Sequence, residues 1–485
     1  MGRNVPRWLW LAAPAAYLLY FHGLTTAGLL GPDEPRYAAI GQAMARTGDW
    51  VTPRLWGDPW FEKSPLLYWM SAAGYRLGWG PELAPRLPVA LLAVAFLAFY
   101  WWILRREFGG RAAALATWIL ATTAAWVGFA YAGVTDMPLA ATFSAAMLLA
   151  LPWIAKGDRR RLPLIAALFG VALLAKYAVA AVLAAPLALR WRSLGDWVRP
   201  RVAGVLALVA APWYVLCFVR NGMAFPQVAW EHQFGRFTSG ALGHVQPWWW
   251  YLPVLLGLLL PWTPLLALLA RAARTADPRR VFLLAWAVFG LVFFSLSANK
   301  LPGYLLPLCP PVAALMGLGL AEAPRARAWL AACALLLALF PLAAPLIPSA
   351  LAEGLRRAGH PALAWMWLLP AAGIAAAAWI LDSRGHRLAA TAMVALGAVA
   401  GAVYAKAEAL PAADRLASAR PLWRSIEDRA AEVCLDRVKR DFAYGLAYYA
   451  GQPLPDCSAQ ARPLHLVEAP GQPPHVASTA DRPAR

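Results

Sequence analysis

The sequence predicts an all-α polytopic membrane protein with about thirteen transmembrane helices and a small α/β domain at its C-terminal end. Two features of the composition support this fold class. Hydrophobic residues make up 61% of the 485 residues and charged residues only 14%, whereas a soluble chain of this length carries far more surface charge. The apolar residues also gather in blocks of roughly 20, the length that an α-helix needs to cross a bilayer.

The apolar blocks give the predicted spans directly. The first block follows a short basic stretch, is too long for a signal-peptide core and has no small-residue cleavage site after it, so we expect an uncleaved span. The fifth and sixth blocks are short and meet at Lys176, which leaves re-entrant or broken helices as the alternative there. The predicted spans cover residues 8–30, 84–104, 112–131, 136–155, 162–175, 177–190, 201–219, 248–270, 280–297, 302–320, 327–347, 363–381 and 388–405.

The basic residues predict the orientation in the membrane. The net charge of +19 is spread over short clusters between apolar blocks, a pattern that favours loops beside an anionic lipid surface over a nucleic-acid partner. Arginine clusters such as Arg105 with Arg106, or Arg159 to Arg161, occupy every second loop. The positive-inside rule places these loops and the N-terminus in the cytoplasm, so an odd number of spans leaves the C-terminus in the periplasm.

Two domains are expected from the change in composition after the last span. Residues 1–405 form the predicted transmembrane domain, with long outer loops at about 31–83 and 220–247. The first of these loops contains two amphipathic stretches, 35–46 and 65–77, which are typical of helices that lie on the membrane surface.

The second domain, residues 406–485, is charged and is predicted to be periplasmic. Its last fifteen or so residues are rich in Pro, Ala and Arg, a composition typical of disorder. Cys434 and Cys457 are its two cysteines. Because the periplasm is an oxidising compartment, we expect them to form a disulfide.

Ionisable residues at the ends of spans are costly beside lipid and therefore mark candidate sites. Asp33 and Arg36 follow the first span directly, although Asp33 could instead cap a helix that has Pro35 in its first turn. Lys63 is suited to hold a phosphate as a point charge. The alternative is an ordinary ion pair between Lys63 and Glu62 at a loop turn.

Further candidates lie on the same outer side. Asp136 opens the fourth predicted span, where capping a helix is the alternative role. Lys176 separates two short apolar segments, and the alternative for it is a side chain that snorkels to the surface. Lys300 and Tyr304 lie at the start of the tenth span, within reach of a lipid phosphate.

The second long outer loop offers ligands for a divalent metal. Glu231, His232, Arg236 and His244 supply carboxylate, imidazole and guanidinium groups, but their spacing matches no recognised metal-ligand pattern. No nucleotide-binding loop, dinucleotide fingerprint or serine-nucleophile motif is present. The convergence of acids and bases on one face predicts a site for an anionic amphiphile.

Three segments of the first outer loop closely resemble the bacterial undecaprenyl-phosphate aminoarabinose (lipid A) transferases, which fall within the wider group of protein O-mannosyltransferase-like enzymes. These segments are Asp33 to Tyr37, Gly48 to Pro53 and Phe61 to Trp69. The resemblance implies the GT-C glycosyltransferase fold, commonly thirteen spans and a periplasmic C-terminal domain. Later segments follow in the family's order, namely Thr135 to Pro138, Leu174 to Lys176, Glu231 to Phe237 and Asn299 to Tyr304.

The resemblance also implies roles for individual residues. Asp33 matches the family's essential aspartate, and Asp136 its second acidic position. The family's double proline after the lysine is Ser64-Pro65 here. The chain diverges from the family after about residue 321, so the resemblance does not identify the acceptor. Lys63, Arg236 and Tyr304 look like the positions that hold the carrier phosphate, and Glu62 and His232 lie where a metal has been proposed. The full set of candidate substrate-binding residues is Arg36, Lys63, Lys176, Arg236, Lys300 and Tyr304.

The predicted function is a glycosyltransferase that moves a sugar from a polyprenyl-phosphate donor to lipid A or another envelope acceptor at the periplasmic face. By the resemblance, the sugar is 4-amino-4-deoxy-L-arabinose. No essential cofactor is expected, and a divalent metal is the one candidate. The alternative is a transporter or flippase of lipid-linked sugars, but such proteins place ionisable groups near the bilayer midplane in repeated halves, and no repeat is visible here.

Overall fold

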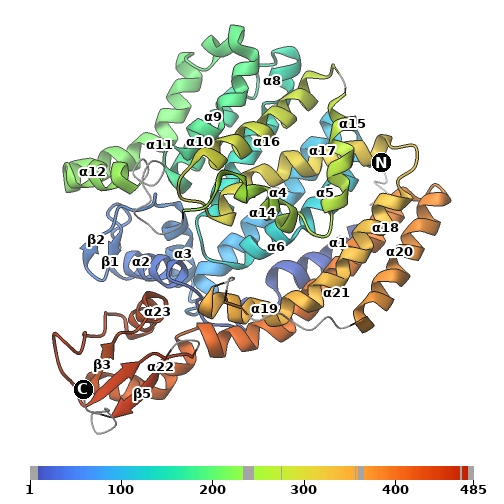
Figure 1. The fold of residues 1–485 in the computed structure, drawn as a ribbon. Helices are drawn as coiled ribbons and strands as arrows, with labels where there is room; N and C mark the ends of the chain where they lie inside the picture. Colours follow the sequence, from blue (N-terminus) through green and yellow to red (C-terminus); the bar gives the residue numbers. More distant parts are fainter. Residues whose placement is uncertain are drawn as a thin grey trace.

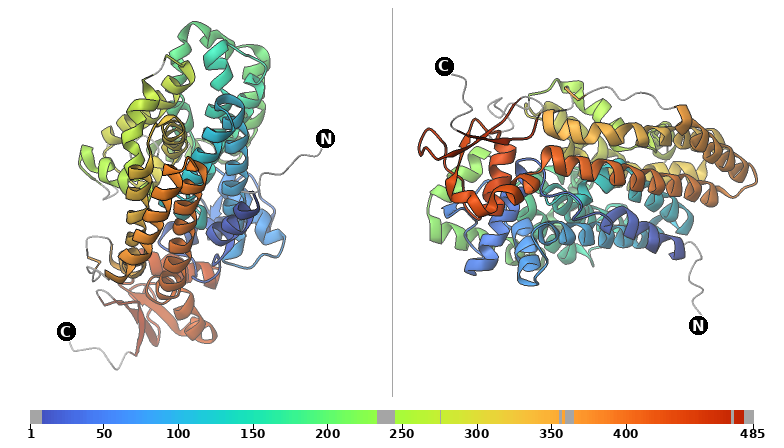
Figure 2. Two further views of the ribbon diagram at one scale, coloured as in Figure 1. Left: turned by 90° about the vertical axis from the view of Figure 1, so that its right-hand side faces the viewer. Right: turned by 90° about the horizontal axis from the view of Figure 1, so that it is seen from below.

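The computed structural model describes residues 9–232, 245–274, 276–354, 357–358, 365–469 and 472–478. Long helices pack side by side into a bundle, and the small C-terminal domain lies at one end of it (Figures 1 and 2). The hairpin of α20 (Leu368–Ser383) and α21 (Arg387–Ala417) extends away from that domain, as the right-hand view of Figure 2 shows. The bundle therefore has two distinct ends.

Helices of membrane-spanning length dominate the described residues. Eight helices there are long and apolar enough to cross a membrane, and up to ten if each of two bent pairs counts as one span. The bent pairs join α5 (Gly110–Ala121) to α6 (Ala124–Tyr131) at 55°, and Trp248–Leu258 to Thr263–Ala272 at 111°. The eight are α4 (Leu83–Phe108), Asp136–Lys156 (α7 and α8), α11 (Pro200–Asn221), α16 (Pro278–Leu296), Pro302–Glu322 (η6 and α17), Arg327–Glu353 (α18, η7 and α19), Trp365–Ser383 (η8 and α20) and α21.

The count of thirteen spans is not confirmed. In the first predicted span, α1 (Leu9–Ala16) and the π-helical turn η1 (Tyr17–Phe21) end at His22, whose backbone is extended. The sixth predicted span, 177–190, is not a continuous helix. The chain breaks after α9 (Leu162–Lys176) at Tyr177, which has a φ of 46°. Only α10 (Val179–Leu183) and the 3-10 segment η2 (Ala185–Asp196) follow, so the broken-helix alternative is confirmed.

The first outer loop folds into the two helices expected from its amphipathic pattern. These are α2 (Asp33–Thr47) and α3 (Leu66–Arg76), with a small antiparallel pair of strands, β1 (Arg54–Leu55) and β2 (Asp58–Pro59), between them. Gly48 ends α2 in the left-handed region, with a φ of 74° that glycine adopts without strain. In the second loop, α12 (Ala224–Trp230) is described, and residues 233–244 lie outside the described ranges.

The C-terminal domain is an α/β unit with its own core. The last long helix, α21, passes the expected boundary at residue 405 and ends at Ala417. Cys434 and Cys457 form the predicted disulfide. Strand β3 pairs in parallel with β4, and β4 pairs in antiparallel with β5. The elements are α22 (Arg420–Ile426), η9 (Glu427–Glu432), β3 (Val433–Asp436), α23 (Arg440–Ala450), β4 (Leu464–Val467) and β5 (His475–Ser478).

Polar contacts hold this domain against the first outer loop. The Tyr448 hydroxyl donates to the carbonyl oxygen of Pro81 at 2.7 Å, and the Tyr449 hydroxyl donates to Glu82 at 3.1 Å. Gly28 completes the contact, because a Cβ there would lie 2.8 Å from the Tyr449 hydroxyl oxygen. As a result α23 packs on α2, as Figure 1 shows, and the domain borders the loop that carries Asp33.

Candidate functional site

The start of α2 presents two carboxylates in opposite environments. Asp33 is the first residue of the helix, and its side chain is 45% exposed. Pro32 occupies the N-cap position without a side-chain capping bond, so the capping alternative for Asp33 is wrong. Glu34, the next residue, is buried to 3% exposure.

Glu34 belongs to a fully bonded buried cluster. Its two oxygens accept from the guanidinium of Arg86 at 2.7 Å each, and they also accept the backbone N–H groups of Leu30 and Gly133 at 2.9 Å. Arg86 has no exposed surface and donates to three further carbonyl oxygens of the chain after α1. The Glu34 cluster therefore ties the loop after α1 to the start of α4.

Asp33 belongs instead to a chain of ion pairs. Arg36 pairs with Asp33 and also with Glu62, whose other oxygen lies 3.0 Å from the ammonium of Lys63. Burial disfavours the charge on Arg36, but the carboxylates of Glu62 and Asp33 outweigh it and raise the pKa of Arg36 above its ordinary value. These four residues, the Asp33 cluster, connect α2 to the loop before α3.

Lys63 also lines a cavity of about 90 Å³ that gathers most of the remaining candidates. Asp136 begins α7 there and accepts from the ammonium of Lys176, at the end of α9, at 2.9 Å. The same ammonium lies 4.7 Å from the centre of the Tyr304 ring. His232 completes the described polar lining with Ser297 and Asn299.

Local backbone geometry brings these side chains together. The break at Tyr177 ends α9, so Lys176 lies at a helix end that faces the start of α7. Gly303 lies against Asp136, since a Cβ there would come within 2.7 Å of the carboxylate oxygen. This close approach lets Tyr304, on the segment after α16, reach the same cavity.

Other candidates lie apart from this cavity or outside the described residues. Lys300 is buried to 4% exposure, donates to the carbonyl oxygen of Ser297 and is absent from the cavity lining. Burial lowers the pKa of Lys300. Arg236 and His244 fall outside the described residues.

Of the two residues expected to hold a divalent metal, Glu62 is bonded to other groups in this arrangement. Both oxygens of Glu62 already face cations, Arg36 at 3.1 Å and Lys63 at 3.0 Å. A metal ion at Glu62 would have to displace one of them. In the described chain, the one group of three potential ligands is Cys434, Cys457 and His465, and its two cysteines are joined in the disulfide.

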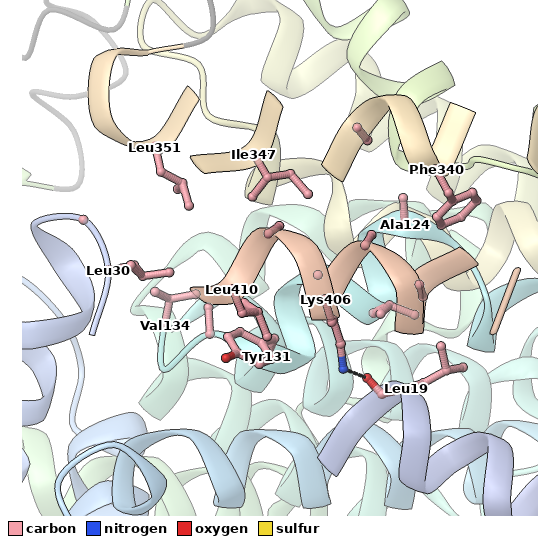
Figure 3. A pocket seen from close by; sticks show the side chains of 18 of the residues that line it. Leu19, Leu30, Ala124, Tyr131, Val134, Phe340, Ile347, Leu351, Lys406 and Leu410 are labelled. Carbon is pink, nitrogen blue, oxygen red and sulfur yellow. Dashed lines mark hydrogen bonds between the residues drawn. The ribbon is translucent and has the colours of Figure 1, made fainter. Parts of the chain in front are cut away.

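Another cavity, of about 540 Å³, has Asp33 on its lining (Figure 3). Its walls are mostly apolar and come from α6, α19 (Leu339–Glu353) and α21, with Tyr131, Ile347 and Leu410 among them. Gly31, Pro32, Asp33 and Glu34 lie on its lining. The ammonium of Lys406 donates to the carbonyl oxygen of Leu19 at 2.5 Å, the bond drawn in Figure 3, and so binds the end of η1.

One residue of the site is not predicted from the sequence. Tyr444, on α23 of the C-terminal domain, places its ring 5.3 Å from the Arg36 guanidinium, and Trp60 lies on the same group at 5.6 Å. The ring of Tyr444 also contacts Trp56 at 5.5 Å. The helical spacing of Tyr444 and Tyr448 marks an aromatic face of α23, but nothing local indicates its partner far away in the sequence.

The fold is that of a GT-C-type membrane glycosyltransferase. Residues 62–219 match the family model described as dolichyl-phosphate-mannose-protein mannosyltransferase. The structure of the Archaeoglobus fulgidus oligosaccharyltransferase tethered with an acceptor peptide shares this fold at 15% identity. It has a TM-score of 0.52, over 92% of this chain and 63% of that one. These matches show the GT-C fold, and the long apolar helices of the described residues show a multi-pass membrane protein.

The particular resemblance is to the aminoarabinose transferases. The solved structure of ArnT from Cupriavidus metallidurans bound to undecaprenyl phosphate matches with a TM-score of 0.77 and 25% identity, over 98% of both chains. The undecaprenyl phosphate-alpha-4-amino-4-deoxy-L-arabinose arabinosyl transferase of Pseudomonas paraeruginosa is 34% identical over 324 residues, 64% of this chain. That match spans 58% of the relative's own length. The resemblance seen in the first-loop motifs is thus confirmed in sequence and in fold.

Proposed function

We propose that this chain transfers a sugar from a polyprenyl-phosphate carrier to a lipid acceptor at the periplasmic face of the bacterial inner membrane. The observation that carries the proposal is the place of Asp33 between two cavities of opposite character. Through Arg36 and Glu62 it is connected to the cationic cavity of Lys63, and its own surface lines the apolar cavity of Figure 3. The lipid-linked donor would occupy the first cavity and the lipid acceptor the second, so that the two substrates meet at Asp33.

The cavity lined by Lys63, Lys176 and Tyr304 is the proposed donor-phosphate site. Two ammonium groups and a phenol suit a phosphate diester. The similar ArnT structure from Cupriavidus metallidurans is bound to undecaprenyl phosphate, which supports a polyprenyl phosphate as this ligand. Lys300, buried against Ser297, is proposed to shape the segment before Tyr304 rather than contact the donor.

The apolar cavity is the proposed place of the acceptor's acyl chain. Its volume of about 540 Å³ lies within the usual range for small-molecule sites, roughly 300–1,000 Å³. Its lining is mostly apolar, with Asp33 and Glu34 at one end and the Lys406 ammonium, which is bonded to Leu19, elsewhere on the wall. An acyl lipid places its reacting headgroup at that polar end. Lipid A is the acceptor that the aminoarabinose transferase relatives suggest, and the sugar is then 4-amino-4-deoxy-L-arabinose.

The proposed reaction is nucleophilic displacement at the anomeric carbon of the donor sugar. The acceptor oxygen forms the new bond to this carbon as the bond to the carrier phosphate breaks, and the polyprenyl phosphate leaves with the electron pair. Lys63 and Lys176 neutralise the charge that grows on the leaving phosphate. Asp136 holds the Lys176 ammonium through their 2.9 Å ion pair.

The role of Asp33 depends on the acceptor group. A hydroxyl acceptor needs a base that takes its proton, and Asp33 is the exposed carboxylate at the meeting point of the cavities. A phosphate acceptor is already ionised at neutral pH, so Asp33 would orient the sugar through its amine or hydroxyl. A pH–rate profile flat across the carboxylate range would favour the orienting role.

The orientation and the domain division belong to the same proposal. Arginine-rich loops at the end of the bundle opposite Asp33 support a cytoplasmic position for that end. Asp33 and the C-terminal domain then face the periplasm, where the Cys434–Cys457 disulfide is stable. The candidate site residues, among them Asp33, Lys63 and Asp136, gather at one end of the bundle, which favours an enzyme over the flippase alternative.

Mass spectrometry of lipid A tests this function. Lipid A from cells that carry the chain should gain the mass of an aminopentose, and the gain should vanish in cells that carry Asp33→Asn at equal protein level. Unchanged lipid A with the active chain would exclude this acceptor. The same extraction would then be searched for the sugar on other envelope lipids, polysaccharides and proteins.

A further inference from the structure

A separate cavity lies at the end of the bundle opposite Asp33. It has a volume of about 1010 Å³ and lies between the α4–α5 connection and the α20–α21 connection. Arg86, beside the Glu34 cluster, and Arg105, on this cavity, belong to the same helix α4. Their separation along the helix axis is roughly 28 Å at the usual rise per residue. The two regions therefore lie near opposite faces of the membrane.

The cavity has a cationic rim. Arg105 and Arg111 line it with exposed side chains, and His386 and Arg387 come from the α20–α21 connection. Arg105 lies 5.2 Å from the ring of Trp101, which keeps its guanidinium beside the opening. A cluster of this kind attracts an anion at the membrane surface.

The nearby carboxylates are already bonded to other groups. Glu107 lies 3.5 Å from Arg279, and Asp382 accepts from Arg387 at 2.7 Å. Within the described ranges, neither Arg105 nor Arg111 has a carboxylate partner. Both arginines are thus available to an anion from outside the chain, whereas Arg387 is bonded inside it.

Two helices also begin at this cavity. Gly110 and Arg111 are the first residues of α5, and Arg387 and Leu388 are the first of α21. Neither helix start has a side-chain capping bond. Uncapped N–H groups and the positive end of the helix dipole add to the attraction that Arg105 and Arg111 exert on an anion.

The rest of the cavity is apolar and continues along the helices. Trp118, Met393 and Leu396 line it one to three turns beyond the charged rim. A free phosphate or nucleotide would leave this part in contact with water, whereas a lipid chain would fill it. The combination of a cationic rim and an apolar wall matches a lipid with an anionic headgroup.

We propose that this cavity binds an anionic diacyl phospholipid of the leaflet opposite the active site, with its phosphate between Arg105 and Arg111 and one acyl chain along α5 and α21. The site is independent of the transfer reaction, because it shares no lining residue with either cavity beside Asp33. Its occupant holds the α4–α5 and α20–α21 connections together.

Native mass spectrometry of the purified full chain, titrated with phosphatidylglycerol, tests the proposal. The wild-type chain should retain one tightly bound lipid, and Arg105→Gln with Arg111→Gln should weaken that binding about 30-fold, given about 1 kcal/mol for each cation beside an anionic lipid. The matched control is Arg192→Gln with Arg201→Gln, two exposed arginines outside the cavity. This control removes the same charge and should bind like wild type.

Three further binding measurements distinguish a lipid site from a site for any anion and from a general effect of charge. Zwitterionic phosphatidylethanolamine should bind more weakly than phosphatidylglycerol, and excess inorganic phosphate should not displace the lipid. Ala389→Trp, at an exposed position of the lining, should weaken lipid binding while every arginine remains. Equal loss in the control pair, full displacement by phosphate, equal binding of both lipids or no effect of Ala389→Trp would each overturn the proposal.

Discussion

Asp33 and Glu34 are neighbours with the same charge, and the structure uses them in opposite ways. Glu34 is buried and accepts four hydrogen bonds, two of them from Arg86. Asp33 is 45% exposed and pairs with Arg36. A carboxylate whose oxygens are all bonded inside the protein holds the fold together, while one with free surface beside a cavity can reach a substrate.

The two clusters around these residues differ in the same way. The Glu34 cluster joins α2, α4 and the chain after α1, so its loss affects the packing of both helices. The Asp33 cluster lies between two cavities and adds a ring from the C-terminal domain. Mutations in the first should therefore change stability, and those in the second should change activity.

Loss of Arg86 gives the largest expected effect. Arg86→Met leaves the Glu34 carboxylate buried without its cation, which costs about 3–5 kcal/mol in the free energy of unfolding. Thermal unfolding of the detergent-purified chain measures the change. The double variant Arg86→Met with Glu34→Gln should recover part of this loss. An unchanged melting temperature in the single variant would contradict a structural role for the cluster.

Loss of the Asp33 carboxylate should remove activity without loss of stability. Asp33→Asn keeps the shape of the side chain, and the rate of sugar transfer should fall about 10²- to 10⁴-fold if Asp33 acts as the base. The melting temperature should stay close to that of wild type, because the side chain is half exposed. Asp58→Asn, on the exposed strand β2, is the matched control with an expected wild-type rate.

The two lysines of the donor cavity should affect donor binding. Lys63→Gln and Lys176→Gln each remove a charge-assisted contact worth about 1.5–3 kcal/mol, so the KM for the lipid-linked donor should rise about 10- to 150-fold. Lys156→Gln removes an exposed lysine at the end of α8 and serves as control. Wild-type donor affinity in both cavity variants would place the carrier phosphate elsewhere.

The smallest expected effect comes from Tyr444. Its ring stacks on Arg36 and so positions the guanidinium that holds Asp33. A cation–π contact is worth about 0.5–2 kcal/mol, so Tyr444→Ala should lower kcat about 2- to 30-fold with little change in donor KM. Tyr444→Phe keeps the aromatic face and should restore kcat. Equal activity of Tyr444→Ala and wild type would show that this contact of the C-terminal domain does not contribute to the reaction.

Much of this arrangement is predictable because it depends on local patterns. Block length and charge predict most long helices, and amphipathic spacing predicts α2 and α3. The first-loop motifs identify Asp33 and Lys63, which the structure connects through Arg36 and Glu62. When residues lie near each other in one loop, their sequence pattern is enough to predict that they are also neighbours in the structure.

The errors have physical causes that lie outside local sequence. Residues 177–190 are apolar enough for a span, but Tyr177 adopts a positive φ that breaks the helix. The bond between the Lys300 ammonium and the carbonyl oxygen of Ser297 is also not indicated by the sequence, and the contact of Lys300 with a phosphate stays a prediction. Tyr444 reaches Arg36 only because the C-terminal domain packs on α2, a contact between distant parts of the chain.

A reconstituted transfer assay shows most directly whether Asp33 acts on two lipids that meet beside it. Purified wild-type chain and Asp33→Asn, in lipid nanodiscs, would receive undecaprenyl-phosphate aminoarabinose and lipid A. Single-turnover transfer and donor affinity would be measured together. We predict that Asp33→Asn binds the donor as wild type does and transfers sugar at least about 100-fold more slowly. Transfer at the wild-type rate by Asp33→Asn would contradict this role of Asp33.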